Sequence, residues 1–365
     1  MTVLSTLQAT LLRHQQAIDS ALLSAVNGLT EDTQALRAYY GQMRYHLGWV
    51  DSQLQPVRSA TGKLLRPTLL LLAYEAAGAW GLTEQTEYLQ RALPAAAAVE
   101  LIHNFSLIHD DIVDGDTERH HRPTLWTIWG TSNGINSGDG MFALGRLALW
   151  GVLEQGVTAD IAVKLGAILD QTCLVIAEGQ YLDMSFEGHR DISTSMYIDM
   201  IRRKTAELMA CAAELGARLG TSNEETIARL RSFGEAMGIA FQVRDDLLGV
   251  WASSEESGKT EAGDIYRRKQ SLPILHAREH ASDEDKATLI DIYQQQETLT
   301  KEQVDIVLAI MERTGTRAYC RQFLAQQSQL ASTALASIPV LQGEVPTRAL
   351  DDMRVMLEFI DAAAR

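Results

Sequence analysis

ELIHNFSLIHDDIVD (residues 100–114) is the stretch that decides the fold, because it ends an apolar, helix-forming run with three aspartates. Carboxylates are costly in apolar surroundings unless they have a partner. Positions four residues apart on a helix differ by about 40° around the axis and about 6 Å along it. Asp110 and Asp114 can therefore bind the same ligand. A hard divalent cation that bridges phosphate oxygens fits best. A solvated acidic face is the alternative, and the apolar flanks argue against it.

A second acidic pair, Asp245-Asp246, lies in another apolar helical stretch, with Gln242 one turn earlier. Other polar residues also interrupt apolar helices. Each of them taken alone is more often structural than functional. Together they predict a cavity with carboxylates on two facing helices and cations around its rim. These residues are Gln180 and Asp183 at an i, i+3 spacing, Lys204-Thr205, and Gly258-Lys259, Asp264 and Lys269 in a following loop.

Cations cluster close to the first aspartates. Arg119-His120-His121-Arg122 forms a positive loop just after them, and His103 lies seven residues before Asp110 on the same helix face. Lys63 and Arg66 are one turn apart at an expected helix start, where free N–H groups add positive potential. Arginine can hold a phosphate through two hydrogen bonds and lysine supplies a point charge. A solvated loop and a structural core histidine are the alternatives.

Composition excludes several classes of protein. The chain has 365 residues, of which 46% are hydrophobic, and 32 Lys and Arg against 47 Asp and Glu give a net charge of −15. An acidic chain of this kind argues against nucleic acid or an anionic membrane surface as a general partner. Cys173, Cys211 and Cys320 have no paired spacing and are expected to be buried free thiols of a reducing compartment. No signal peptide or membrane span is indicated, so a cytoplasmic location is expected.

Apolar residues recur at three- and four-residue spacing through most of the chain, which predicts an all-α fold. Long helices are expected over 160–187, 195–220 and 223–250, and no strand pattern is evident. Turn-forming residues predict breaks at 115–124, 131–139 and 253–264. We predict one all-α domain over 1–365, with a core at about 35–280 and a peripheral helical layer at about 281–365.

The motifs resemble those of the trans-isoprenyl diphosphate synthases, the polyprenyl synthetase family. The resemblance rests on residues 100–114, on FQVRDD at 241–246 and on GKTEAGDIYRRKQSLP at 258–273, in the family's order, and covers roughly 35–280. It implies a single large helical bundle around a central substrate cavity, the isoprenoid synthase fold, in a chain that is commonly a homodimer. It also implies a prenyltransferase that joins isopentenyl diphosphate to an allylic diphosphate with about three Mg²⁺ ions.

The resemblance assigns roles residue by residue. The implied metal ligands are Asp110, Asp111, Asp114, Asp183, Asp245 and Asp246. The residues implied to hold the allylic diphosphate are Arg119, Lys204, Lys259 and Lys269. Lys63, Arg66 and His103 would hold the diphosphate of isopentenyl diphosphate. Thr205 and Gln242 would face the allylic carbons, and Gln180 would contact substrate.

Two positions depart from the family pattern. Gly249 stands where a common form of the second segment has a third aspartate, which lowers the density of carboxylates there. His120 stands where the family often has arginine. Neutral histidine has an ordinary pKa of about 6.5, and a nearby diphosphate would favour its cation, so we expect His120 to bind substrate.

Product length is a question of cavity depth. Phe105 lies five residues before Asp110, about 7.5 Å down the helix, whereas Ser106 is small. A large ring at this place should act as a floor and limit the product to the short class. The pattern resembles members that form the C20 product geranylgeranyl diphosphate, with farnesyl diphosphate as the alternative.

Two other classes share part of the pattern. A class I terpene cyclase has a similar first motif, but it would carry an Asn/Asp, Ser/Thr and Glu metal triplet on the opposite helix, which residues 245–253 do not supply. A cyclase would also not need Lys63, Arg66 and His103. A non-catalytic subunit of a prenyl synthase should have lost metal carboxylates, whereas this chain keeps both leading pairs.

Overall fold

The structure is a computed structural model that describes residues 3–27, 33–57, 62–85, 87–186, 189, 191–252, 262–295, 297–339 and 341–362. Contacts within the chain define two compact units. Unit 1 consists of Met1–Cys173, Cys211–Arg231 and Pro339–Met353, and unit 2 of Leu174–Ala210, Ser232–Ile338 and Arg354–Arg365. The prediction of one domain over the whole chain stays a prediction.

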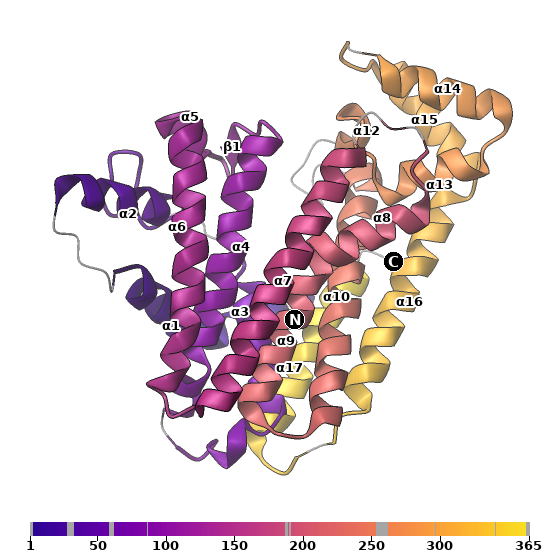
Figure 1. The fold of residues 1–365 in the computed structure, drawn as a ribbon. Helices are drawn as coiled ribbons and strands as arrows, with labels where there is room; N and C mark the ends of the chain where they lie inside the picture. The colour runs from indigo at the N-terminus through magenta and orange to yellow at the C-terminus, as the bar shows by residue number, and fades with distance from the viewer. Residues whose placement is uncertain are drawn as a thin grey trace. The chain divides into compact units, whose positions relative to one another are not determined.

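Both units are helical (Figure 1), so the predicted fold class is confirmed. Unit 1 contains α1 (Val3–Asn27), α2 (Gln34–His46), α3 (Leu65–Ala76), the 3-10 turns η1 (Ala79–Gly81) and η2 (Tyr88–Arg91), α4 (Leu93–Val113), β1 (Glu118–Arg119), β2 (Arg122–Pro123), α5 (Leu125–Trp129), α6 (Thr131–Trp150) and η3 (Gly151–Leu153). Unit 2 contains α8 (Thr194–Ile201), the π-helical segment η4 (Arg202–Ala206), α12 (Gly263–Tyr266), α13 (Leu272–His280), α14 (Asp283–Gln294), α15 (Lys301–Arg313) and α16 (Thr316–Ala336). Four helices contribute residues to both units: α7 (Ala159–Phe186), α9 (Glu207–Gly220), α10 (Glu224–Trp251) and α17 (Glu344–Asp361).

Helix α4 carries the first aspartates and is the buried centre of unit 1. Pro94 lies in its first turn, where the missing N–H costs nothing, and the alanines at 95–98 favour helix. All residues from Ala95 to Ile102 are buried. Gly115, with φ +67°, follows the C-cap Asp114 and ends the helix in the left-handed conformation that glycine tolerates best.

Helix α6 lies along α4 (Figure 1), and three glycines allow the two to approach closely. A Cβ on Gly134 would be 2.7 Å from Ile112, and one on Gly138 would be 2.2 Å from Nε2 of His109. The prediction of a break at 131–139 is therefore wrong, because this segment is the first part of α6. Its glycines make room for a neighbouring helix instead of forming a turn.

Glycines also allow α3 and α9 to pack closely. Leu69 to Leu72 of α3 are fully buried, and each such side chain contributes about 1.5–3 kcal/mol through its removal from water. A Cβ on Gly216 would lie 2.0 Å from the carbonyl oxygen of Leu70, and one on Gly220 2.5 Å from that of Tyr74. Backbone contact this close requires glycine on α9.

A buried ion cluster ties α1 and α17 to α3 within unit 1. Glu75 has no exposed surface and pairs with Arg13 at 2.7 Å and with His14 at 3.2 Å. Arg13 also lies 2.8 Å from Asp352 of α17. Tyr88 donates its hydroxyl to Glu75 at 2.5 Å, so the buried carboxylate is fully engaged. Removing one partner from such a cluster would leave a buried charge uncompensated.

The long helices expected over 160–187 and 223–250 are α7 and α10, each of which begins and ends within one residue of the prediction. The helix expected over 195–220 is continuous, but it consists of α8, the π-helical η4 and α9, and η4 contains Lys204 and Thr205. The residues after 281 form α14 to α17, and their assignment to a peripheral layer stays a prediction. Part of the break expected at 253–264 lies outside the described residues.

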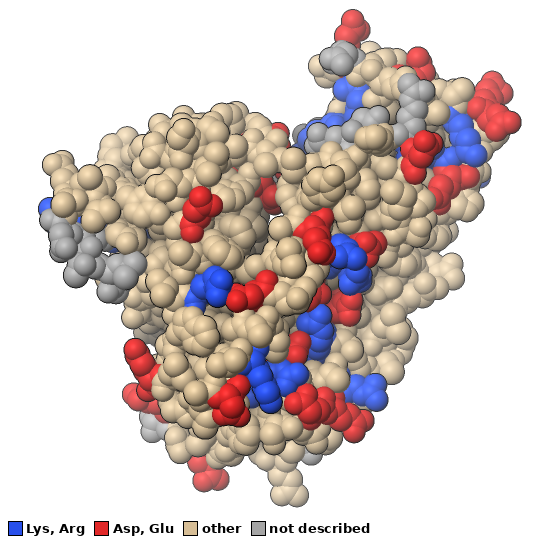
Figure 2. All heavy atoms as spheres, viewed as in Figure 1, with Lys and Arg blue, Asp and Glu red and all other residues tan. Residues whose placement is uncertain are grey.

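Acidic and basic side chains are interspersed on the face shown in Figure 2. Exposed pairs such as Arg146 with Asp170 (2.9 Å) contribute about 0–1 kcal/mol each. Among the described helices, none combines the length and apolar character needed to cross a membrane.

Candidate active site

The first aspartates lie at the C-terminal end of α4, in unit 1. Asp114 follows the last helical residue and donates its backbone N–H to the carbonyl of Asp110 at 2.8 Å. The two residues therefore keep the helical i, i+4 spacing that the sequence predicted. Asp110 is half-buried and Asp114 is exposed, so both carboxylates belong to one accessible rim.

Asp111 differs from its neighbours because it points inward and is only 1% exposed. Its Oδ1 accepts from Nε of Arg119 at 2.7 Å, and the second guanidinium nitrogen, Nη2, lies at 2.7 Å as well. Burial raises the pKa of Asp111, and the bond from Arg119 opposes that rise. Its Oδ2 is buried and, among the described residues, accepts no hydrogen bond. One oxygen is thus anchored and the other remains available.

A pocket in unit 1 opens beside Asp111 and contains several of the predicted substrate residues. His103 lines it from α4, and Arg119 and His120 line it from the β1–β2 hairpin. The hairpin turn holds His120 and His121 at φ +52° and +61°, a region that histidine enters more readily than most residues. Lys63 precedes α3 and is exposed, whereas Arg66 lies in the first turn of α3.

Arg66 and His103 are joined directly. Nη1 of Arg66 donates to Nε2 of His103 at 3.0 Å, because a guanidinium can only donate. Burial first, and then the charge of Arg66, hold the pKa of His103 well below its ordinary value. The imidazole is therefore neutral near pH 7 and carries its proton on Nδ1, from which it can donate to a ligand.

Sequence reasoning missed three residues of this pocket. Burial raises the pKa of Glu100 to about 7, although the charge of Arg66 opposes the rise. Asn104 donates to Oε1 of Glu100 at 3.0 Å. Burial lowers the pKa of His46, at the end of α2, to about 3. The i, i+3 spacing of Glu100 and His103 on one helix could have indicated that Glu100 belongs to the pocket. Nothing in the sequence indicates His46.

The two predicted chain-length residues lie on different faces of α4. Phe105 faces α6, where its ring stands edge-on to Phe142 with centroids 5.1 Å apart and also contacts the ring of His109. Ser106 donates its hydroxyl to the carbonyl of His103 at 2.8 Å. Phe105 is therefore in contact with one ring from α6 and one from its own helix.

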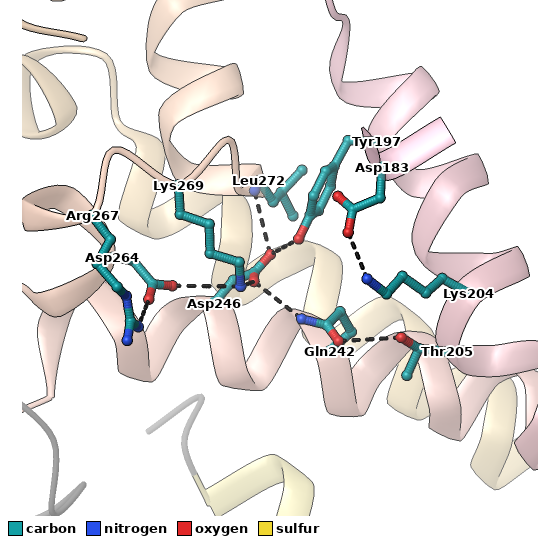
Figure 3. A network of polar contacts seen from close by, with 10 residues as sticks. All are labelled: Asp183, Tyr197, Lys204, Thr205, Gln242, Asp246, Asp264, Arg267, Lys269 and Leu272. Carbon is teal, nitrogen blue, oxygen red and sulfur yellow. Dashed lines mark hydrogen bonds and ion pairs between the residues drawn. The ribbon is translucent and has the colours of Figure 1, made fainter. Parts of the chain in front are cut away.

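The second set of residues lies in unit 2 and is drawn in Figure 3. Asp183 in the last turn of α7 accepts from Nζ of Lys204 at 2.7 Å. Thr205 donates to Oε1 of Gln242 on α10 at 3.4 Å. Lys204 and Thr205 occupy the π-helical η4, and such local widening of a helix is frequent at functional sites. A Cβ on Gly179 would lie 2.4 Å from the backbone nitrogen of Lys204, so glycine allows this approach.

The two aspartates of the acidic pair on α10 have different surroundings. Asp245 is about one-third exposed and pairs with Arg244 at 3.1 Å. Asp246 is fully buried, and its two oxygens accept from Tyr197, Gln242 and Lys269 and from the backbone N–H of Leu272 (Figure 3). The two neighbours therefore differ in both exposure and hydrogen-bond partners.

The departure at Gly249 has a structural reason. A Cβ on Gly249 would lie 2.2 Å from Oδ2 of Asp264, so the Asp264 carboxylate fills the space beside this residue. Asp264 is 5% exposed, pairs with Arg267 at 2.8 Å and lies 3.7 Å from Nζ of Lys269. Asp264 of α12 therefore places a carboxylate beside the position on α10 where the common family form has its third aspartate.

The remaining predicted residues are Gln180 and Lys259. Both polar side-chain atoms of Gln180 are buried and have no hydrogen-bond partner among the described residues, which leaves an amide open to a ligand. Gly258 and Lys259 lie outside the described residues.

The donor set fits Mg²⁺. No group of three or more acidic, histidine or cysteine side chains in the described part of the chain forms a metal cage alone. Magnesium is normally bound by one or two carboxylates, with phosphate oxygens and water completing its shell. Asp110, Asp114 and Asp183 lie in the last turn or at the cap of their helices, where the helix dipole disfavours carboxylates and favours cations by about 0.3–1 kcal/mol each. Cations at these positions would relieve that cost.

Comparison with known proteins places this geometry in a family. A polyprenyl synthetase profile matches residues 48–311. The chain belongs to the polyprenyl synthetase family. It is therefore a prenyltransferase, and the resemblance drawn from its motifs is confirmed.

Relatives in this family are similar over most of their length. A geranylgeranyl diphosphate synthase of Mycobacterium tuberculosis is 35% identical over 80% of this chain and 79% of its own. A (2E,6E)-farnesyl diphosphate synthase of the same species is 37% identical over 75% and 74%. The crystal structure of a geranylgeranyl pyrophosphate synthetase from Pyrococcus horikoshii has a TM-score of 0.84 at 28% identity and covers 99% of both chains. A polyprenyl synthetase from Streptomyces coelicolor has a TM-score of 0.82 at 30% identity, with 96% and 98% covered.

Proposed function

We propose that this chain condenses isopentenyl diphosphate head-to-tail with an allylic diphosphate (dimethylallyl, geranyl or farnesyl) in a Mg²⁺-dependent reaction. The product we assign is geranylgeranyl diphosphate, with farnesyl diphosphate as the alternative. The observation that carries the proposal is the placement of carboxylates at helix C-terminal ends, with Arg119 paired to the buried Asp111 and Lys204 to the more exposed Asp183, in a chain of this family.

About three Mg²⁺ ions would be bound in all, with Asp110, Asp111 and Asp114 as ligands in unit 1 and Asp183 and Asp245 as ligands in unit 2. Bound there, these ions would neutralise diphosphate charge and act as Lewis acids. The Oδ2 of Asp111, which accepts no hydrogen bond from the described residues, supports this set, as do the exposure of Asp114 and the partial exposure of Asp110 and Asp245. Asp246, also predicted as a ligand, has protein partners on both oxygens, and we assign it another role below.

The cations would bind the two diphosphates. Lys63, Arg66, His103 and His120 would bind isopentenyl diphosphate, with neutral His103 donating through Nδ1. Arg119, Lys204, Lys259 and Lys269 would bind the allylic diphosphate. Lysine charge stabilises the departing diphosphate as the carbon–oxygen bond breaks. The oxygens of Thr205 and Gln242 would face the allylic cation. Gln180 of α7 would also contact the substrate, through its side-chain amide.

The remaining steps need no protein nucleophile. The double bond of isopentenyl diphosphate attacks the allylic cation, and holding both substrates in place removes most of the entropic cost. A proton is then lost to the released diphosphate, as family chemistry implies.

One assay tests the proposal against the other classes. Purified protein is incubated with Mg²⁺, isopentenyl diphosphate and each of the three allylic primers, and products are separated by chromatography. Chain elongation that ends at C20 is expected. Diphosphate release from one allylic substrate alone would instead indicate a terpene cyclase, and no reaction would indicate a non-catalytic subunit.

A Phe105→Ala variant is expected to lengthen the products beyond C20. Removing the ring also frees the space beside Phe142, so the growing chain gains room. Chromatography of the dephosphorylated products measures the shift. Ser106→Ala, which keeps the volume of the adjacent position, is the matched control and should leave the profile unchanged; an unchanged profile in Phe105→Ala would refute the floor.

A His120→Arg variant is expected to lower the apparent KM for isopentenyl diphosphate severalfold at pH 8. Burial first, and then the charge of Arg119, lower the pKa of His120, so the wild-type imidazole is neutral at this pH and the arginine is not. The difference should shrink as the pH falls below the pKa of His120. His121→Arg is the control, because it has the same backbone conformation but does not line the pocket. Equal KM values for wild type and His120→Arg at pH 8 would show that His120 does not contact substrate.

We also propose a cytoplasmic homodimer without stable membrane insertion. Three free cysteines, two of them buried, support a reducing compartment. Leu147 on α6 and Val163 on α7 are about 60% exposed, and a second copy would cover such apolar side chains. Light scattering during size-exclusion chromatography would measure the mass in solution.

A further inference from the structure

Tyr197 of α8 is a buried residue that the family resemblance assigns to no role. Its side chain is 2% exposed, and its hydroxyl donates to Oδ2 of Asp246 at 2.6 Å (Figure 3). A hydrogen bond of this length to a carboxylate is a strong, charge-assisted one.

Asp246 also contacts two predicted substrate residues, Gln242 and Lys269. Its Oδ2 also accepts from the N–H of Leu272, the first residue of α13, at 3.3 Å. Its Oδ1 accepts from Nε2 of Gln242 at 3.3 Å and from Nζ of Lys269 at 3.4 Å. One oxygen is therefore held by structural donors, and the other holds the side chains of Gln242 and Lys269.

The division between the two oxygens suggests what the carboxylate does. A fully buried carboxylate is costly unless its hydrogen-bonding capacity is filled. Tyr197 supplies the shortest of the four contacts, so it sets the rotation of the carboxylate about its Cβ–Cγ bond. That rotation fixes where Oδ1 lies, and Oδ1 fixes the positions of Lys269 and Gln242.

We propose that Tyr197 is a positioning residue of the prenyl transfer reaction, which acts through Asp246 to hold Lys269 and Gln242 ready for the allylic diphosphate. The inference rests on the proposed function, because that function gives Lys269 and Gln242 their substrate. It assigns Asp246 to the orientation of cations and amides and not to direct contact with metal.

Tyr197→Phe removes the hydroxyl and keeps the ring. The KM for the allylic diphosphate is expected to rise about tenfold, while the KM for isopentenyl diphosphate and the thermal midpoint stay within the range of the control. Calorimetry with an unreactive allylic thiodiphosphate should show the same tenfold loss of affinity without turnover. Tyr319→Phe is the control, since it removes a hydroxyl that bonds Thr194 in unit 2 and does not contact Asp246.

A double-mutant cycle separates positioning from a general structural effect. If Tyr197 acts through Asp246, the variant Tyr197→Phe with Asp246→Asn should have the allylic KM of Asp246→Asn alone, within about twofold. Independent effects would instead multiply, and that result would overturn the inference. A wild-type allylic KM in Tyr197→Phe, or equal rises for both substrates, would overturn it as well.

Asp246→Asn provides the test if Tyr197→Phe does not fold. It keeps the shape of the side chain and removes the charge that holds Lys269, so the same selective rise in the allylic KM is expected, and its absence would overturn the inference. Failure of the proposed function is a separate result, because wild-type protein would then elongate no primer.

Discussion

Asp110→Asn is expected to lower kcat/KM for chain elongation by about a thousandfold. Asp110 lies in the last turn of α4 and shares a face with Asp114, at the negative end of the helix dipole. The amide keeps the size of the side chain but loses the charge that binds a divalent cation. A metal ion supplies several kcal/mol of charge stabilisation, and about 4 kcal/mol corresponds to three orders of magnitude in rate.

Steady-state kinetics over a range of Mg²⁺ concentrations measure the effect. Asp116→Asn is the matched control, because Asp116 is an exposed acid in the loop just after α4 and its loss changes the net charge equally. It should stay within a fewfold of wild type. Retention of more than about a tenth of the activity by Asp110→Asn would remove Asp110 from the metal site.

Gly216→Ala is expected to lower the thermal midpoint by roughly 6–12 °C. The new Cβ would lie 2.0 Å from the carbonyl oxygen of Leu70, and backbone atoms of two packed helices cannot move aside as a side chain can. Forcing extra volume into a packed core costs about 1–3 kcal/mol, and this contact belongs at the upper end. For domains of 150–250 residues, 1 kcal/mol shifts the midpoint by roughly 2–4 °C.

Differential scanning calorimetry measures the midpoint. Gly62→Ala makes the same chemical change where no atom lies within 4 Å of the new Cβ and where φ is not in the left-handed region, so its midpoint should equal that of wild type. An equal midpoint in Gly216→Ala would show that α3 and α9 are less closely packed than the structure has them.

The all-α class and most helix positions could be predicted because they depend on short-range patterns. The 3.6-residue period predicted α7 and α10 to within a few residues. The segment at 131–139 was predicted wrongly, because local propensity treats glycine as a turn former. Only the neighbouring α4 shows that Gly134 and Gly138 are spaces for Ile112 and His109.

The candidate site, like the fold, has some features that the sequence determined and others that depend on tertiary packing. By itself the sequence determined the carboxylates and cations, their order, and the i, i+4 pairing of Asp110 with Asp114, because helical geometry fixes distances between residues near in sequence. Only the tertiary structure decided which partners these groups have: Arg119 on Asp111, Asp264 beside Gly249, and Tyr197 on Asp246. Those partners lie 8, 15 and 49 residues away in the chain. Burial and pairing at such separations follow from how helices pack, and no local period in the sequence carries that information.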